Sequence, residues 1–333
     1  MLPPRPVASA LDAIGNTPVV QLQRLVPPGS AAVFVKLEGF NPTGSYEDRM
    51  ALAMIEEAEN RGALTRDLTV VEYTCGSTGS SLAFVCAAKG YKFHAVSSDA
   101  FAATKLNTIR AFGAELTIVH SPSGEISAAL MREMMTAAAA IAAEGGCYQT
   151  DQFNNRDSLI GYAGIGQELV AQFPEGIDCF CGAVGTAGLL MGVAGVLREF
   201  SQDTRIVALE PASTPVITEG HSGQHHIDGI GVGFVPPLLD RELYDDVRVV
   251  DEDVARSICR QLAEKEGLLV GTSSGVNIAA ALDLARQLGP GKVVVTVACD
   301  TGLKYLDDNL FADAHRAREV MSRRRIVARV LRE

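Results

Sequence analysis

Short apolar runs alternate along the chain with longer segments in which apolar residues recur every three or four positions. The short runs predict strands at residues 33–37, 68–73, 93–97, 116–120, 147–150, 179–184, 205–210, 247–250 and 292–298. The longer segments predict helices at residues 46–61, 80–89, 103–112, 125–143, 158–172, 188–200, 251–266, 275–288 and 314–332. This alternation predicts an α/β fold in which parallel sheets are covered by helices on both faces. Ligands of such sheets bind beyond the carboxyl ends of the strands.

Residues 35–49 carry the densest set of signals. The segment begins as a strand, turns through Asn-Pro-Thr-Gly at 41–44 and enters the helix expected at 46–61. Ser45 is the expected N-cap of that helix. A strand, a glycine turn and a helix N-terminus together direct amide groups and the positive end of the helix dipole to one point. The segment is therefore suited to hold an anion or a reacting group.

Composition narrows the class of protein. The chain has 333 residues, 47% of them hydrophobic, and a formal net charge of −11. The acidic balance argues against binding to nucleic acid or to an anionic membrane surface. No apolar run reaches the roughly 20 residues that span a bilayer, and the N-terminus lacks the apolar core of a signal peptide. We therefore expect a cytoplasmic protein that does not bind membranes.

The seven cysteines predict buried, reduced thiols rather than disulfides. Cys179 and Cys181 lie on one face of a predicted strand, and they are expected to pack in the core rather than to ligate a metal. The histidines form no helical metal-binding pattern. No metal site is expected.

Three further glycine-containing turns each lead into a predicted helix, and the first two of them follow a predicted strand. They lie at residues 74–79 (Thr-Cys-Gly-Ser-Thr-Gly), 185–189 (Gly-Thr-Ala-Gly-Leu) and 271–275 (Gly-Thr-Ser-Ser-Gly). Hydroxyl and amide groups at such turns can bind carboxylate or phosphate. Each turn alone could equally be a plain helix N-terminus.

Together these segments resemble the fold-type-II pyridoxal-phosphate (PLP) enzymes of the cysteine synthase and cystathionine β-synthase family. The family signature K-L-E-x-x-N-P-x-G-S-x-K-D-R matches residues 36–49 at nine positions, including Lys36, Asn41 and Arg49. Residues 14–18, 152–155, 227–231 and 300–306 also resemble family segments, so the resemblance covers about residues 11–310. It implies two three-layer domains with parallel sheets and a site in the cleft between them. The expected division is 1–45 and 151–333 for a large PLP-binding domain, and 46–150 for a small, mobile substrate domain.

The resemblance also implies roles for individual residues. The substrate carboxylate would be bound by Thr74, Cys75, Gly76, Thr78 and Gln152. Cys75 and Ser77 replace the family's serine and asparagine, and Ser77 falls where the family contacts the 3′-oxygen of the cofactor. The cofactor phosphate would be bound by Gly185, Thr186, Ala187, Gly188 and Leu189, and the pyridine nitrogen by Ser273.

Glu47 is the main departure, because it occupies the position of the family lysine that forms the Schiff base with PLP. A carboxylate cannot form an imine, although burial can raise its pKa enough for it to act as a base. Three interpretations stay open. The chain is a Lys→Glu variant of a working enzyme, or a natural member that binds PLP non-covalently or not at all, or another lysine such as Lys36 or Lys304 takes the role.

The expected function is PLP-dependent β-replacement on an activated serine with a sulfur nucleophile, as in cysteine biosynthesis, impaired by Glu47. The first alternative is a β-eliminating lyase or dehydratase of the same fold. The second is a non-catalytic protein that binds PLP or an amino acid. An amino-acid substrate and a homodimer are implied by the resemblance.

Overall fold

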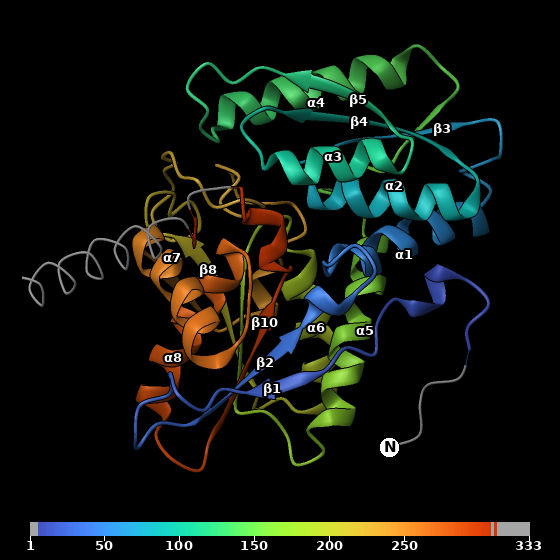
Figure 1. Cartoon of the computed structure of the whole chain (residues 1–333). Helices are drawn as coiled ribbons and strands as arrows, with labels where there is room; N and C mark the ends of the chain where they lie inside the picture. The colour runs from blue at the N-terminus through green and yellow to red at the C-terminus, as the bar shows by residue number, and fades with distance from the viewer. Residues whose placement is uncertain (1–5, 308–309, 312–333) are drawn as a thin grey trace, which may run out of the picture.

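The computed structural model describes residues 6–307 and 310–311. The helix expected at 314–332 lies outside these residues. The described chain forms two sheets, one above the other in Figure 1, with helices between and around them. None of its helices combines the length and the apolar character that crossing a bilayer requires.

The larger sheet has six strands in the order β1-β2-β10-β7-β8-β9. The strands are parallel except for the antiparallel pair β1–β2. Their bounds are β1 Val19–Gln21, β2 Ala32–Leu37, β7 Cys179–Ala183, β8 Arg205–Pro211, β9 Asp246–Val250 and β10 Val293–Ala298.

The smaller sheet has four parallel strands in the order β5-β4-β3-β6. Their bounds are β3 Thr69–Tyr73, β4 Lys92–Ser98, β5 Glu115–Val119 and β6 Cys147–Gln149. This sheet lies within residues 69–149, and the domain division at residues 45 and 150 stays a prediction.

The helices alternate with the strands as the apolar pattern predicts. Their bounds are α1 Glu47–Asn60, α2 Ser77–Lys89, α3 Ala103–Ala111, α4 Ala128–Ala143, α5 Asp157–Gln172, α6 Gly188–Phe200, α7 Glu252–Gln261 and α8 Thr272–Leu288. Short 3₁₀ segments lie at η1 Ala10–Ala13, η2 Glu38–Phe40, η3 Arg241–Leu243 and η5 Gly302–Tyr305, and a π-helical turn, η4 Leu262–Glu266, follows α7.

Some expected boundaries are wrong by a few residues. Helix α2 begins at Ser77 instead of residue 80, so half of the predicted turn at 74–79 belongs to the first turn of the helix. Helix α4 begins three residues late because the Ser127 side chain accepts the amide of Leu130 and caps it there. The single helix expected at 251–266 is an α-helix that changes into a π-helical turn.

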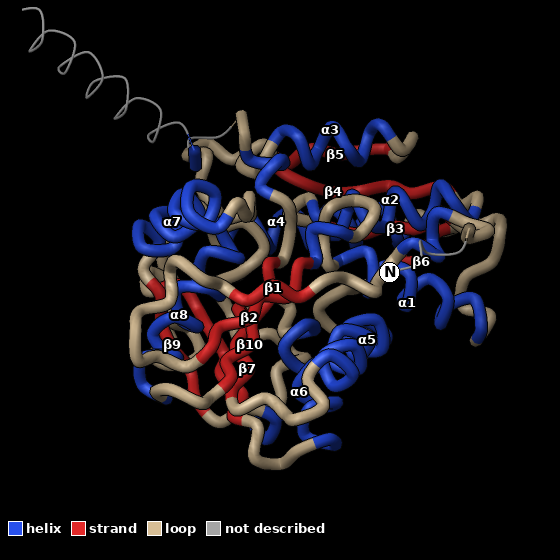
Figure 2. Tube along the Cα trace, turned by 60° about the horizontal axis from the view of Figure 1, so that its bottom comes forward, coloured by secondary structure: helices blue, strands red, loops and turns tan. Residues whose placement is uncertain are grey.

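One hydrophobic core is shared by the two sheets. It joins Met54 of α1 and Leu82 of α2 to Ile165 of α5 and Leu190 of α6, together with one face of each sheet. Helix α1 packs against both α2 and α5, so it links the two layers. Figure 1 shows α1 between them, and Figure 2 shows α5 and α6 side by side against the larger sheet.

The outer face of each sheet has its own cover. Helix α4 covers the smaller sheet over Val71 and Val96, and α7 and α8 cover the larger sheet. Cys179 and Cys181 are fully buried beneath α8, as expected for packing residues. Among the described residues no group of three or more histidine, cysteine or acidic side chains could hold a metal ion.

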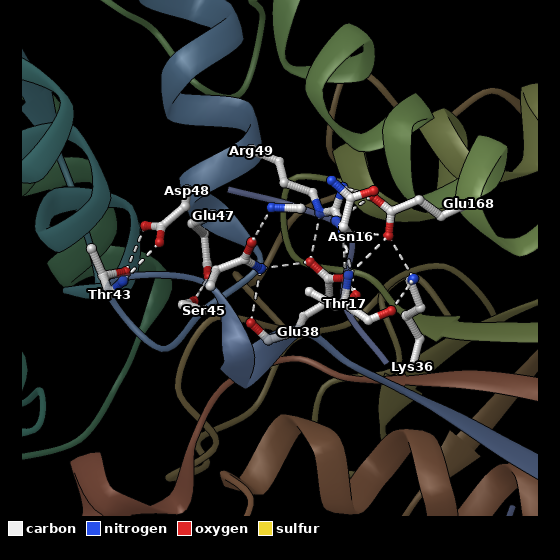
Figure 3. Close-up of polar contacts among 12 residues, drawn as sticks. Asn16, Thr17, Lys36, Glu38, Thr43, Ser45, Glu47, Asp48, Arg49 and Glu168 are labelled. Carbon is white, nitrogen blue, oxygen red and sulfur yellow. Dashed lines mark hydrogen bonds and ion pairs between the residues drawn. The ribbon is translucent and has the colours of Figure 1, made fainter. Parts of the chain in front are cut away.

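A buried ion-pair network fixes the start of α1 (Figure 3). Arg49 donates from Nε to Glu38 at 2.7 Å and from a terminal nitrogen to Glu168 of α5, also at 2.7 Å. Lys36 Nζ donates to the same Glu168 at 2.6 Å and to the carbonyl of Thr17 at 2.8 Å. Burial opposes the charge on Glu168, but Arg49 and Lys36 outweigh it and lower the pKa of Glu168 to about 2. The network therefore fixes the positions of strand β2, helix α1 and helix α5 relative to one another.

The expected N-cap role of Ser45 is wrong. Tyr46 occupies the N-cap position and makes no side-chain capping bond, whereas the Ser45 hydroxyl donates to the carboxylate of Glu47. Glu47 and Asp48 lie in the first turn, where the helix dipole favours acidic side chains. The Ser45 hydroxyl, which could have capped the helix, is therefore hydrogen-bonded to the carboxylate at position 47 instead.

Substitution Arg49→Ala tests the network. It leaves the buried Glu38 carboxylate without its cation, so we expect the free energy of unfolding to fall by about 3–5 kcal/mol in urea denaturation. The matched control is Lys292→Ala, which removes an exposed pair with Asp178 at 2.8 Å. That control should leave the unfolding midpoint nearly unchanged, and equal midpoints for the two variants would contradict the role given to Arg49.

Candidate active site

A cavity lies where the two sheets meet, and it brings together residues that are far apart in the sequence. Most of the predicted site residues line it: Glu47, Cys75, Ser77, Thr78, Gln152, Thr186 and Ser273. The remaining predicted residues do not line it: Thr74, Gly76, Gly185, Ala187, Gly188 and Leu189. These six belong to the backbone turns that place the lining residues.

The turn between β3 and α2 is organised by Thr74. The Thr74 Oγ1 accepts the amides of Gly76 and Gly79, each at 2.9 Å, so its hydroxyl is used inside the turn. Thr78 Oγ1 donates to Gln152 Oε1 at 2.9 Å, and Gln152 Nε2 donates to the Tyr73 carbonyl at 2.7 Å. Two side chains expected to bind the substrate carboxylate are therefore in direct contact.

The turn between β7 and α6 approaches other backbone closely. Ala187 has a φ of 69°, in the left-handed region, immediately before α6 begins at Gly188. A Cβ on Gly185 would lie 2.1 Å from the carbonyl oxygen of Gly229, so glycine is required there. Thr186 Oγ1 accepts the Gly188 amide at 3.2 Å, while the other amides of the first helical turn have no acceptor within the helix. Leu189 is buried in the shared core.

Ser273 lies in the first turn of α8 and lines the cavity, as does Thr186 of the turn before α6. The next residue, Ser274, accepts the amide of Cys299 at 2.9 Å and so ties α8 to the end of β10. Cys299 also lines the cavity, and burial raises the pKa of its thiol, which stays protonated at neutral pH.

Glu47 is the carboxylate in the cavity. Only 9% of its surface is exposed, and burial raises the pKa of Glu47 to about 7 against the opposing charge of Lys304. Lys304 is itself buried, its Nζ has no hydrogen-bond partner, and burial lowers its pKa. The carboxyl at position 47 can therefore gain or lose a proton near neutral pH.

Lys105 is the lysine among the described residues that line the cavity, and the sequence analysis missed it. Its Nζ donates to Asp228 at 2.9 Å and to the Tyr305 hydroxyl at 2.8 Å. Burial acts to lower the pKa of Lys105, but Asp228 and Asp300 outweigh burial and raise it. A protonated amine held in this way is a poor nucleophile. The apolar periodicity of residues 103–112 shows a helix but gives no sign that Lys105 faces a cavity.

The two lysines considered as substitutes for position 47 do not line the cavity. Lys36 is held by Thr17, Glu168 and Gln172 in the ion-pair network. Tyr46, Tyr162 and Tyr305 line the cavity as well, and they also were not predicted. Segments 227–231 and 300–306 do contribute, through Asp228 and Asp300.

Comparison with known proteins identifies the class. The pyridoxal-phosphate-dependent enzyme family matches residues 10–300, and the chain belongs to it. The chain is similar to the cysteine synthase of Staphylococcus aureus, with 42% identity over 311 residues that cover 92% of this chain and 98% of that protein. The family and its solved relatives have the fold-type-II architecture of cysteine synthase.

Two solved structures are close in shape. An O-ureido-L-serine-bound lysine-to-alanine mutant of O-ureido-L-serine synthase is 37% identical, with a TM-score of 0.87, and covers 92% of this chain and 94% of that one. A cysteine synthase from Entamoeba histolytica is 28% identical, also with a TM-score of 0.87, and covers 94% of this chain and 93% of that one.

The residues present fit part of the cofactor that this family uses. The α6 turn, with its close backbone approach at Gly185, and the hydroxyls of Thr186 and Ser273 suit a phosphate and a pyridine ring. Position 47 does not fit, because Glu47 offers no amine for a covalent bond to the aldehyde. The site is therefore suited to the phosphate and the ring of the cofactor, but it offers no group that could bond covalently to the aldehyde carbon.

Substitution Glu47→Gln should change stability in a pH-dependent way. The pKa of Glu47 is raised from 4.5 to about 7, so the folded chain holds an extra proton between these values and loses stability as pH rises through them. Glutamine removes this loss, so we expect the variant to gain roughly 2–4 kcal/mol relative to the parent at pH 8 compared with pH 4.5.

Urea denaturation at the two pH values measures the effect. The exposed Glu219→Gln is the matched control and should show no such difference. A change in stability for Glu47→Gln that is the same at both pH values would show that the Glu47 carboxyl does not titrate in this range.

Proposed function

We propose that this chain is a cysteine synthase-like protein that binds pyridoxal phosphate and an amino acid non-covalently. Its β-replacement activity on an activated serine with a sulfur nucleophile is impaired by Glu47. The observation that carries the proposal is the cavity itself, where Glu47, Ser77, Thr186 and Ser273 come from four separate segments and meet. Its support from relatives is the similarity to cysteine synthases.

Each part of the cavity has a task under this proposal. The amides at the start of α6 and Thr186 bind the phosphate, where the positive end of a 13-residue helix favours an anion. Ser273 hydrogen-bonds the pyridine nitrogen, and Ser77 lies beside the ring. Thr78 and Gln152, already in contact with each other, bind the substrate carboxylate.

Pyridoxal phosphate, when bound, supplies an electron-accepting ring. The chain's own contribution is to hold the ligand and to control one proton. The Glu47 carboxyl, with a pKa of about 7, can accept a proton from a bound amino acid and return it. It cannot supply the amine that holds the aldehyde in the family. When one of several groups that act together with a cofactor is removed, the reaction rate typically falls by orders of magnitude. We therefore expect slow turnover.

Substitution Glu47→Lys tests the assignment. The Glu47→Lys chain should become yellow with pyridoxal phosphate and, after borohydride treatment, should carry a cofactor mass on residue 47, whereas the parent should carry none. Addition of an activated serine should change its visible spectrum. A Glu47→Lys chain that is folded by circular dichroism but stays colourless in excess pyridoxal phosphate would refute the proposal.

Product analysis of the Glu47→Lys chain separates the two reactions of the fold. A sulfur-containing amino acid formed from O-acetylserine and sulfide supports β-replacement. Keto acid and ammonia formed without a thiol would instead support elimination. The amino-acid substrate, the homodimer and the cytoplasmic location stay predictions.

A further inference from the structure

The side chain at position 47 has the opposite charge and hydrogen-bonding character to the lysine of the family signature. In the family signature an amine stands there and meets an aldehyde. In this chain a carboxylate stands there, buried to 9% exposure and supported by the hydroxyl of Ser45. An aldehyde oxygen only accepts hydrogen bonds, and so does a carboxylate. The two groups therefore have no bond to share, unless the carboxyl holds a proton.

The surrounding charges reinforce this reversal. The cavity charge cluster consists of three carboxylates and one amine that line the cavity, Glu47, Asp228, Asp300 and Lys105, together with Lys304, which does not line it but whose charge acts on Glu47. With all five charged, the formal balance is −1, whereas a lysine at position 47 would make it +1. One additional cation would therefore neutralise the formal charge of the cluster.

The two amines of the cluster do not satisfy its acids. Lys105 is held by Asp228 at 2.9 Å and lies 3.9 Å from Asp300. Asp300 Oδ1 is buried without a hydrogen-bond partner, although Asp300 is only 3% exposed and lines the cavity. Burial lowers the pKa of Lys304. Lys304 is therefore less readily protonated, and it competes less strongly with a ligand cation for the carboxylate of Glu47. The other oxygen, Asp300 Oδ2, accepts the Tyr305 hydroxyl at 2.8 Å, and Lys304 Nζ is also buried without a partner, so the acid that a ligand meets in the cavity is Glu47.

We propose that this site selects the amine form of the vitamin B6 phosphates, pyridoxamine 5′-phosphate or a secondary amine on the same carbon, over the aldehyde form. The proposal rests on the proposed function, because the phosphate and the ring are held by the same residues. The ammonium of pyridoxamine phosphate carries three donors, that of a secondary amine carries two, and either would lie against Glu47. A hydrogen bond between a buried carboxylate and an ammonium is about twice as strong as one between neutral groups.

Titration calorimetry of the full chain at pH 8 tests the proposal with three ligands that share phosphate and ring. These are pyridoxamine phosphate, pyridoxal phosphate and pyridoxine phosphate, which bear an ammonium, an aldehyde and a neutral hydroxyl on the reacting carbon. We expect pyridoxamine phosphate to bind about tenfold or more tightly than either of the others.

Two variants locate the preference. Glu47→Gln keeps the shape of the side chain and removes its charge, so it should bind pyridoxamine phosphate and pyridoxine phosphate about equally. Glu219→Gln, at an exposed position, is the matched control and should keep the preference of the parent. Circular dichroism and a cooperative thermal transition establish that both variants are folded.

The outcomes separate this proposal from the function on which it rests. If pyridoxal and pyridoxine phosphates bind as tightly as pyridoxamine phosphate, the selection of the amine is wrong while the cofactor site stands. The same conclusion follows if Glu47→Gln retains the preference. If none of the three ligands binds the parent chain, both the selection and the proposed function are wrong.

Discussion

The site depends on one buried set of charges, in which Arg49 joins Glu38 and Glu168 while Lys36 shares the same Glu168. These side chains come from β2, the segment after it, α1 and α5. Their ion pairs fix the positions of these elements relative to one another, which the turn between β2 and α1 alone could not do. Because buried charges are costly unless paired, any shift of α1 would leave a carboxylate or a guanidinium unpaired. The consequence is that position 47, two residues before Arg49, is fixed at the cavity whatever its side chain.

This rigidity explains how a single residue can change the chemistry of the site while the fold stays intact. Helices α1, α2 and α8 each present a first turn to the same cavity, and the turn before α6 contributes Thr186; the last three of these segments carry hydroxyl side chains suited to anions. The first, α1, carries Glu47, whose carboxyl is accommodated by Ser45 and by the amine of Lys304. Under the proposed function, the carboxylate at position 47 changes which ligand is complementary to the cavity more than whether a ligand binds there.

The apolar pattern was sufficient to predict every strand from β2 to β10 within about two residues, because buried parallel strands and amphipathic helices leave distinct periods. It failed where local hydrogen bonds decide, as at Ser45, whose hydroxyl bonds Glu47 instead of capping α1. The motifs predicted which turns face the cavity, since the carboxyl ends of parallel strands share an edge. Lys105 could not be found, because its role arises from contacts with Asp228 and Tyr305, 123 and 200 residues away.

A crystal structure of the chain grown with pyridoxamine phosphate tests the central claim most directly, because it shows which atoms of the ligand meet which residues. The account predicts the phosphate at residues 185–189, the ring nitrogen at Ser273 and the amine in contact with Glu47. A ligand bound elsewhere, or with its amine turned away from Glu47 toward solvent, would contradict it.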